Sequence, residues 1–291
     1  MTTYNPTTKK WATLPNMTAR SAPACAYLSG RLYVFGGVAR KANASHHDPD
    51  PTIKFALVES IAVSGDGQAI EAAWRREPDM PFGPRESPSA TTLLGGDGGG
   101  IVVAGGFDSG IVNGTFDFEY FNTSYLFDGA SYAALPDMPF KRSNMALVAT
   151  KDKRVYAFGG GETAPSYSTC ASLSLAALAN SSTTPRTTRE LKKGTWDACP
   201  PLADARSWAA AGIVGDDIVI TGGMGGTFAP TAETDVLSLS PSLSPSLSPQ
   251  NWTDAGCDLP IVAGFLSGAV TVDAKTFVVV AGNGVAYVYQ P

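Results

Sequence analysis

The sequence predicts an all-β protein made of repeated four-stranded antiparallel units. A short apolar segment that ends in Gly-Gly recurs along the chain, and the repeats are spaced as such units would be. The composition agrees, because 44% hydrophobic residues together with 31 Gly and 21 Pro are typical of many short strands joined by tight turns. With 291 residues, the chain can bury a sizeable core.

The repeated segment is expected to be one strand of each unit. Its copies are LYVFGG ending at Gly37, IVVAGG at Gly106, VYAFGG at Gly160, IVITGG at Gly223 and, more loosely, VVVAGN at Asn283. Successive copies end 69, 54, 63 and 60 residues apart. The glycines give the chain the backbone freedom for a sharp exit from the strand.

A second set of residues recurs in register with the first. An aromatic residue is followed by a Pro-containing turn and then by Arg. The sets are Trp11 with Pro15 and Arg20, Trp74 with Pro78 and Arg85, Tyr132 with Pro136 and Arg142, and Trp196 with Pro200 and Arg206. The fifth set, Trp252 with Pro260, has Ala263 or Gly264 where Arg would stand. This two-part register resembles the kelch repeat over essentially the whole chain.

The resemblance implies a kelch-type β-propeller of the galactose oxidase central-domain-like superfamily. Each blade would have an inner strand, a second strand ending at Gly-Gly, a third strand and an outer strand with the aromatic residue. The aromatic ring can fill the wedge between neighbouring blades. We expect these residues to build blades rather than to perform chemistry.

The repeats predict one domain, 1–291, with five blades. Their approximate bounds are 20–78, 85–136, 142–200, 206–259, and 264–291 completed by 4–15. Residues 286–289 look like a third strand without an outer strand, whereas residues 9–14 look like an outer strand without a blade. Pairing these ends would close the ring and remove both edge strands. A fragment of a six- or seven-bladed array remains the alternative.

The four repeat arginines and the inserts after Gly-Gly are the candidate ligand site. The inserts, residues 38–55 and 107–123, are expected on the face that carries Arg20, Arg85, Arg142 and Arg206. Four guanidinium groups at one mouth would suit a carboxylate or another acidic group, as in kelch proteins that recognise acidic peptides or sialic acid-like sugars. Alternatively, these side chains pair with acids across blade junctions and stabilise the ring.

The second insert is rich in aromatic residues. Phe116, Phe118 and Tyr120 alternate with Asp117 and Glu119. One interpretation is a ridge at the mouth that binds a partner or stacks on a sugar. The other is an extended third strand with one buried face.

The leading functional prediction is a non-enzymatic scaffold that binds a protein or an acidic ligand at this mouth. The alternative is a carbohydrate-acting propeller enzyme, resembling a sialic acid mutarotase with Glu86 and Glu162 near the mouth, or less closely galactose oxidase. The adjacent His46 and His47 disfavour a copper oxidase, because resemblance to that class would imply two histidines from separate blades. Neighbouring side chains of an extended loop also point in opposite directions, so one metal is not expected to bind both. We predict no catalytic residue, metal or cofactor.

The charge and hydropathy patterns exclude some partners. A net charge of −5 argues against nucleic-acid binding. No apolar run reaches the roughly 18 residues of a membrane-spanning helix, and the first residues are not expected to form a signal peptide. A monomeric domain is predicted.

Glycosylation sequons are unusually frequent. Six of the nine Asn residues begin one: Asn16, Asn43, Asn113, Asn122, Asn180 and Asn251. About one or two would arise by chance at this Ser and Thr content. The excess favours a secretory-pathway protein, with the cytosol as the alternative. Cys170 and Cys199 fall on neighbouring predicted strands of the third blade, within reach of a disulfide if the register is right.

Overall fold

A computed structural model shows an all-β chain. It describes all residues except 6, 46–47, 49, 94–98, 114, 163–165, 177–193, 240–250, 265, 274, 282–284 and 290–291. The elements that it describes are β-strands, without an α-helix. The chain divides into two compact units, one of Met1–Ser143 with Leu175–Thr195 and one of Asn144–Ser174 with Trp196–Pro291.

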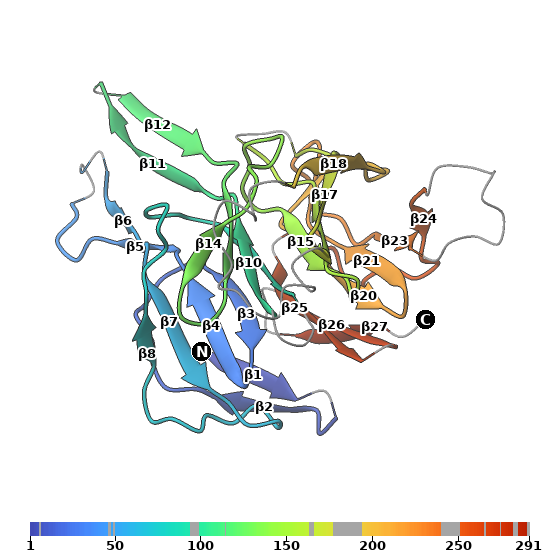
Figure 1. Cartoon of the computed structure of the whole chain (residues 1–291), viewed down its shortest axis with the longest axis horizontal. Helices are drawn as coiled ribbons and strands as arrows, with labels where there is room; N and C mark the ends of the chain where they lie inside the picture. The colour runs from blue at the N-terminus through green and yellow to red at the C-terminus, as the bar shows by residue number, and fades with distance from the viewer. Residues whose placement is uncertain are drawn as a thin grey trace. The chain divides into compact units, whose positions relative to one another are not determined.

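The first unit contains two four-stranded antiparallel sheets, which Figure 1 shows in blue and green. The strands of the first sheet are, in order, β3 (Ala24–Leu28), β4 (Arg31–Phe35), β7 (Val58–Ala62) and β8 (Arg75–Glu77). Those of the second are β9 (Ser89–Leu93), β10 (Gly100–Ala104), β13 (Ser124–Phe127) and β14 (Tyr132–Ala134). The strand before each Gly-Gly is therefore the second strand of its sheet, as predicted.

Three two-stranded hairpins complete the first unit. They are β1 (Thr2–Asn5) with β2 (Lys10–Thr13), β5 (Val38–Arg40) with β6 (Thr52–Lys54), and β11 (Phe107–Val112) with β12 (Thr115–Tyr120). The second and third hairpins are built from the two inserts after Gly-Gly. Both project away from the sheets of their unit (Figure 1).

The second unit contains the remaining sheets. One sheet has β15 (Ala146–Ala149), β16 (Arg154–Phe158), β17 (Cys170–Ser174) and β18 (Trp196–Cys199), and the next has β20 (Ala210–Val214), β21 (Asp217–Thr221), β23 (Thr234–Ser238) and β24 (Thr253–Asp254). A three-stranded sheet has β25 (Leu266–Asp273), β26 (Thr276–Ala281) and β27 (Ala286–Tyr289). The short β19 (Arg206–Ser207) pairs with β22 (Met224–Gly225).

The N-terminal strand has a local partner that the sequence analysis did not identify. Residues 10–13 pair with residues 2–5, so that Trp11 faces Tyr4 in a two-stranded sheet. The last sheet has three strands among the described residues. In this hairpin a short loop links the two strands at little cost in chain entropy, and closure of the ring by pairing residues 4–15 with the last sheet stays a prediction. The number of five blades stays a prediction.

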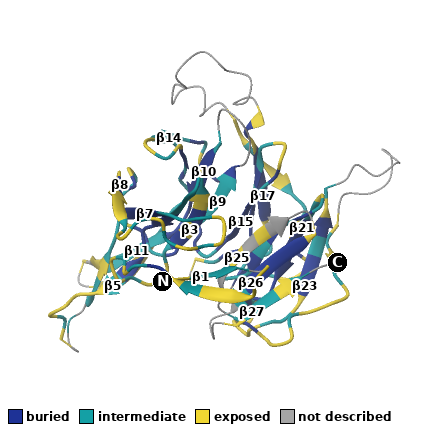
Figure 2. Ribbon diagram, turned by 90° about the horizontal axis from the view of Figure 1, so that it is seen from below, coloured by how far each residue is buried: buried dark blue, intermediate teal, exposed yellow. Residues whose placement is uncertain are grey.

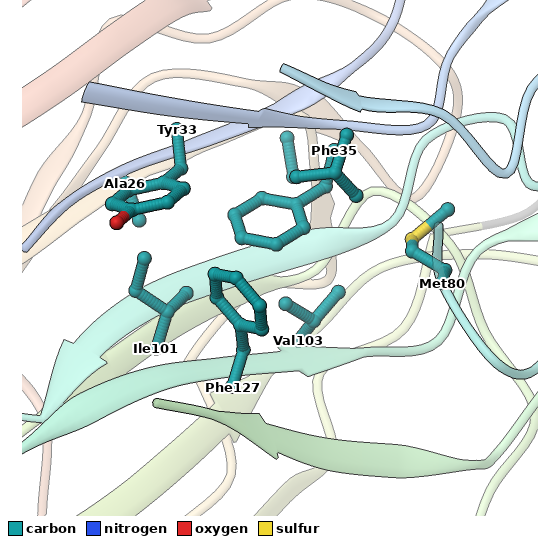
Figure 3. Close-up of a cluster of buried hydrophobic side chains, with 9 residues drawn as sticks. Ala26, Tyr33, Phe35, Met80, Ile101, Val103 and Phe127 are labelled. Atoms are coloured by element: carbon teal, nitrogen blue, oxygen red, sulfur yellow. The ribbon is translucent and has the colours of Figure 1, made fainter. Parts of the chain in front are cut away.

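The core of each sheet comes from the strands before Gly-Gly and their neighbours. Figure 2 shows buried residues along strands such as β10 and β21. In the first unit, Phe35 of β4 and Phe127 of β13 meet edge to face with ring centroids 5.7 Å apart (Figure 3). Burying two such rings removes a large apolar area from water. The contact joins the two sheets of this unit.

The aromatic residue of the outer strand links neighbouring repeats through a hydrogen bond as well. Trp74 Nε1 donates to the Pro15 carbonyl at 2.8 Å, and Trp252 Nε1 donates to the Pro200 carbonyl at 3.0 Å. The Tyr132 hydroxyl similarly donates to the carbonyl of Pro78 at 3.2 Å. Each of these three aromatic residues therefore contacts the Pro turn of the preceding repeat, which explains why the two recur together in the sequence.

Candidate functional site

The backbone of the repeat arginine holds the end of the preceding Gly-Gly strand. In each case the second Gly donates its N–H to the carbonyl of the residue at the Arg position of the next repeat. The pairs are Gly37 to Arg85 at 2.7 Å, Gly106 to Arg142 at 2.8 Å, Gly160 to Arg206 at 2.8 Å and Gly223 to Ala263 at 2.7 Å. Ala263, rather than Gly264, therefore takes the Arg position in the fifth repeat.

The first Gly of the pair is required by this close approach. A Cβ at Gly36 would lie 2.6 Å from the Arg85 carbonyl oxygen, and one at Gly159 would lie 2.2 Å from that of Arg206. Both residues also have positive φ, +63° and +60°. A residue with a side chain would be strained by the positive φ at these positions. Its Cβ would also clash with the carbonyl oxygen of the arginine.

The residue two positions after each repeat arginine has a strained backbone. Ala22, Ser87, Asn144 and Trp208 all have φ between 50° and 57° although none is Gly. This conformation lets Ser87 N–H donate to the Ala22 carbonyl at 2.9 Å, and Trp208 N–H to the Asn144 carbonyl at 3.0 Å. Left-handed backbone at non-Gly residues costs about 1 kcal/mol or more, so tertiary hydrogen bonds must hold it. This conformation could not be predicted from the sequence, because the four residue types differ.

Arg85 is buried between aromatic rings. Its guanidinium carbon lies 3.8 Å from the centroid of Phe121 and 4.1 Å from that of Phe82, and Nη1 donates to the Gly105 carbonyl at 2.9 Å. Only 2% of the residue is exposed, and none of the described carboxylates forms an ion pair with it. Burial lowers the pKa of Arg85 to about 10, so it keeps its charge at neutral pH.

Arg206 occupies the same position of the repeat but binds carboxylates. Its Nη2 lies 2.7 Å from Asp235 Oδ2 and 2.9 Å from Glu233 Oε2, and Nη1 donates to the Glu233 carbonyl at 2.8 Å. Burial raises the pKa of Asp235, against the opposing effect of the Arg206 charge. Arg206 and Glu233 are among the residues that line an open groove of about 430 Å³, but the Arg206 side chain is only 1% exposed, whereas that of Glu233 is exposed.

Arg20 and Arg206 each pair with a carboxylate at the same position of their sheets, a position that could not be assigned from the sequence pattern alone. Arg20 forms an ion pair with Glu59, and both Glu59 and Asp235 are the second residue of the third strand of a sheet. Tyr125 has this place beside Arg85. The ion pairs of Arg20 with Glu59 and of Arg206 with Asp235 therefore each lie within one blade and not across a junction between blades. An acidic residue two places into the third strand is the signal that identifies such a pair.

The four arginines are divided between the two units. Arg20, Arg85 and Arg142 belong to the first and Arg206 to the second. Arg142 is buried and lies over the Phe140 ring, 4.1 Å from its centroid. A common electropositive mouth formed by all four stays a prediction.

The insert after Gly106 has an aromatic face. In the β11–β12 hairpin, Phe107 pairs with Tyr120, Ser109 with Phe118 and Ile111 with Phe116, so these side chains share one side. We call Phe107, Ile111, Phe116, Phe118 and Tyr120 the aromatic face. Phe116 is 44% exposed, Phe118 41% and Ile111 41%, and the rings of Phe116 and Phe118 meet at 5.2 Å.

The interpretation of this insert as the third strand of the blade is wrong, whereas the interpretation as a binding ridge stays a prediction. The residues form extended strands, but β12 is exposed along most of its length, and the third strand of the blade is β13 instead. The backbone of Phe107 exchanges two hydrogen bonds with Glu86, at 2.8 and 2.9 Å, and so fixes the base of the hairpin. Phe116, Phe118 and Tyr120 therefore lie on a two-stranded hairpin outside the four-stranded sheets.

The opposite side of this hairpin is acidic. Asp108 pairs with Glu119 across the strands, and Asp117 stands beside them. Lys54 of β6 lies 4.0 Å from the Asp108 carboxylate and donates to the Ser109 carbonyl, which ties the two insert hairpins together. Asp117 and Glu119 make no ion pair with any described residue. The hairpin is therefore apolar on one side and anionic on the other.

Both edges of the hairpin are partly occupied. The N–H of Ser109 on β11 donates to Asp108 Oδ1 at 2.8 Å, and the N–H of Phe118 on β12 donates to Asp117 Oδ1 at 2.8 Å. These donors are taken by side chains and are less available to an added strand. The exposed side-chain face is the more accessible feature of the hairpin.

The cysteines on the third sheet are adjacent. Cys170 pairs with Cys199 in the β17–β18 register, and the structure joins them in a disulfide with Cα atoms 5.1 Å apart. Cys25 and Cys257 are free.

The residues on which the enzymatic alternatives depend are not brought together within one unit. His46 and His47 lie outside the described residues. Glu86 is half-buried in the first unit, where burial raises its pKa, and Glu162 is exposed in the second. In the part of the chain that the structure describes, no group of three or more His, Cys, Asp or Glu side chains is placed to hold a metal ion. Nor does that part contain a helix long and apolar enough to cross a membrane.

Comparison with known proteins supports the fold. The chain is similar to the solved structure titled "Structure of YjhT", with a TM-score of 0.65 and 15% sequence identity over 97% of this chain and 84% of that one. At this identity, the likeness concerns the fold alone. No family model and no curated protein matches the sequence. The four-stranded antiparallel sheets and this likeness together show a β-propeller fold.

Proposed function

We propose that the chain is a kelch-type binding propeller that captures a protein partner on the aromatic face of the β11–β12 hairpin. The observation that carries this proposal is the gathering of five apolar side chains on one side of an element that lies outside the four-stranded sheets. Exposed clusters of aromatic residues mark interaction sites, because water contact with them is unfavourable until a partner covers them.

The repeat arginines serve this function as positioning residues. Arg85 N–H donates to the Phe55 carbonyl at the end of the first insert, and Arg142 N–H donates to the Phe121 carbonyl at the end of the second. These backbone hydrogen bonds fix the loop ends, and the Arg85 guanidinium also lies over the Phe121 ring at the end of the second insert. A ligand-binding role for Arg20, Arg85, Arg142 and Arg206 would need guanidinium groups that reach solvent, so their burial favours a protein partner over a small acidic ligand.

The charges around the aromatic face indicate the chemistry of the partner. Asp117 and Glu119 lie on the reverse side of the hairpin without a counter-ion among the described residues. A partner segment with apolar side chains flanked by Lys or Arg would complement both sides of the hairpin. Because Asp108 and Asp117 occupy edge N–H groups, we expect contact through side chains and not by strand addition.

Selection of random peptides displayed on phage against the full chain tests this function. We expect the selected peptides to combine aromatic or aliphatic residues with Lys or Arg, and to lose most of their binding to a Phe116→Ser, Phe118→Ser variant. The matched control is Ile70→Ser, which removes a similarly exposed apolar side chain from a different part of the first unit.

The expected losses are large. Removing two anchor side chains should weaken binding at least tenfold, or about 1.4 kcal/mol, while Ile70→Ser retains it. Peptides rich in Asp and Glu whose binding is unaffected by the Phe substitutions would contradict the proposal and support the arginine mouth.

A further inference from the structure

Five of the six sequons lie at described residues, and the structure separates them into two kinds. Asn16, Asn43, Asn113 and Asn251 are exposed and stand in turns or loops between strands; we call them the four exposed sequons. Their side-chain amides make no hydrogen bond to any other described residue. Asn180 lies outside the described residues.

Asn122 differs from these four in both residues that an N-glycosylation site requires. Its Nδ2 donates to the Met138 carbonyl at 3.2 Å, and the residue is half-buried. The hydroxyl of Ser124, the third residue of this sequon, is fully buried and donates to the Pro136 carbonyl at 2.7 Å. A glycan on Asn122 would have to lie where the Pro turn of the second blade packs.

The hydroxyl residues of the four exposed sequons are accessible. Thr18, Ser45, Thr115 and Thr253 are all exposed, unlike the fully buried Ser124. The Thr18 hydroxyl donates to Glu59 Oε1 at 3.0 Å and the Thr253 hydroxyl to the Val236 carbonyl at 3.4 Å, so burial and not hydrogen bonding distinguishes them from Ser124. Asn113 stands in the turn between β11 and β12. This hairpin projects from the sheets of its unit (Figure 1). Bulky, hydrated glycans are accommodated at such surface turns.

The disulfide is an independent observation that bears on the compartment. Cys170 and Cys199 are joined across β17 and β18. Structural disulfides form and persist in the oxidising secretory pathway and outside the cell, which is also where sequons are modified. The disulfide and the sequons therefore both favour the secretory pathway or the extracellular space.

We propose that Asn16, Asn43, Asn113 and Asn251 carry N-linked glycans and that Asn122 does not. In this reaction the Asn Nδ2 forms a bond to the anomeric carbon of a lipid-pyrophosphate-linked oligosaccharide. The bond from that carbon to the pyrophosphate oxygen breaks, the lipid pyrophosphate leaves, and the amide loses one proton. The inference does not rest on the proposed binding function, although Asn113 stands in the turn of the same β11–β12 hairpin.

The first experiment examines the protein isolated from its native cells. Peptide-N-glycosidases F and A convert a glycosylated Asn to Asp, and in ¹⁸O-labelled water this leaves a heavy oxygen that peptide mass spectrometry locates. We expect label at all four exposed sequons and none at Asn122. Native protein in which the peptides of all four exposed sequons carry unmodified Asn would overturn the proposal.

The second experiment resolves the sites one at a time. The full chain is secreted from cultured eukaryotic cells behind an added signal peptide, as single Asn→Gln variants. Asn16→Gln, Asn43→Gln, Asn113→Gln and Asn251→Gln should each remove the mass of one glycan, whereas the matched control Asn122→Gln should leave the glycan mass unchanged. A loss of glycan mass with Asn122→Gln, or no loss with Asn113→Gln, would contradict the assignment.

Discussion

Arg85 and Arg206 hold the same position of the repeat in the two compact units, but different groups surround their charges. Arg85 lies between Phe82 and Phe121 and bonds backbone carbonyls. Arg206 instead binds the carboxylates of Glu233 and Asp235. Their backbones, however, accept the same hydrogen bond from the second Gly of the preceding repeat.

The two arginines share a backbone contact but differ in the groups around their side chains. The backbone contact is common to both units, because it depends on main-chain geometry and on the absence of a Cβ at Gly-Gly. The side-chain environment depends on the third strand, where Asp235 stands in one sheet and Tyr125 in the other. A recurring Arg therefore need not indicate a recurring charge pair.

The largest effect is expected where both units agree. Gly36→Ala and Gly159→Ala would place a Cβ against the carbonyl oxygens of Arg85 and Arg206, so each should lower the free energy of unfolding by about 4 kcal/mol or more. Urea denaturation followed by tryptophan fluorescence measures this. The controls Gly30→Ala and Gly256→Ala have positive φ but no atom within 4 Å, and should cost only about 1 kcal/mol. Equal losses for all four would mean that the carbonyl contact is unimportant.

Removing each guanidinium should distinguish the two units. Arg206→Met leaves Asp235 buried without its cation, so we expect a loss of about 3 kcal/mol in the free energy of unfolding. Arg85→Met leaves no carboxylate unpaired and removes a charge that burial disfavours, so the loss should be about 1 kcal/mol. The same urea titration compares them. A cost for Arg85→Met as large as that of Arg206→Met would show that the aromatic rings stabilise the cation as well as carboxylates do.

The pH dependence of these variants should differ as well. Burial already raises the folded-state pKa of Asp235, and losing Arg206 raises it further. A carboxyl with a raised folded-state pKa contributes stability below its unfolded pKa of about 3.9 and loses that contribution as the pH rises through the folded value.

The deficit of Arg206→Met relative to the unmodified chain should therefore be larger at pH 7 than at pH 4, whereas that of Arg85→Met should stay constant. Urea midpoints at the two pH values check this. A deficit of Arg206→Met that is equal at both would contradict the role given to Asp235.

The smallest effect concerns the strained residues beside the arginines. Ala22→Gly should stabilise the fold by about 0.5 kcal/mol, because Gly relieves the left-handed strain at φ 50° but increases the entropy of the unfolded chain. Thermal unfolding can detect the change. Ala26→Gly, in the middle of β3, serves as the control and should destabilise. Destabilisation by Ala22→Gly as well would show that this strain is minor.

Much of the scaffold could be predicted because its signals repeat. The strands before Gly37, Gly106, Gly160 and Gly223 were all found where expected, and the outer-strand aromatic residues contact the Pro turns of the preceding repeats. The pairing of Lys10–Thr13 with Thr2–Asn5 was missed, because a strand pattern does not say which of two available edges it will join.

The candidate site was predicted less completely. Phe116, Phe118 and Tyr120 were identified from their alternation, but their placement on a separate exposed hairpin was not. The burial of Arg85 and Arg206 was also missed. An arginine in a loop is usually solvated, and only the rings or carboxylates that other strands bring to it allow its burial.

The sequence by itself determined the strands, the Gly-Gly exits and the register in which aromatic, Pro and Arg recur, because these follow from local backbone preferences repeated along the chain. Only the tertiary structure decided which groups surround each arginine, which side of the β11–β12 hairpin meets solvent and which sequon asparagines are free of contacts. Those properties depend on residues far apart in the chain that strand pairing brings together, and no single segment encodes them.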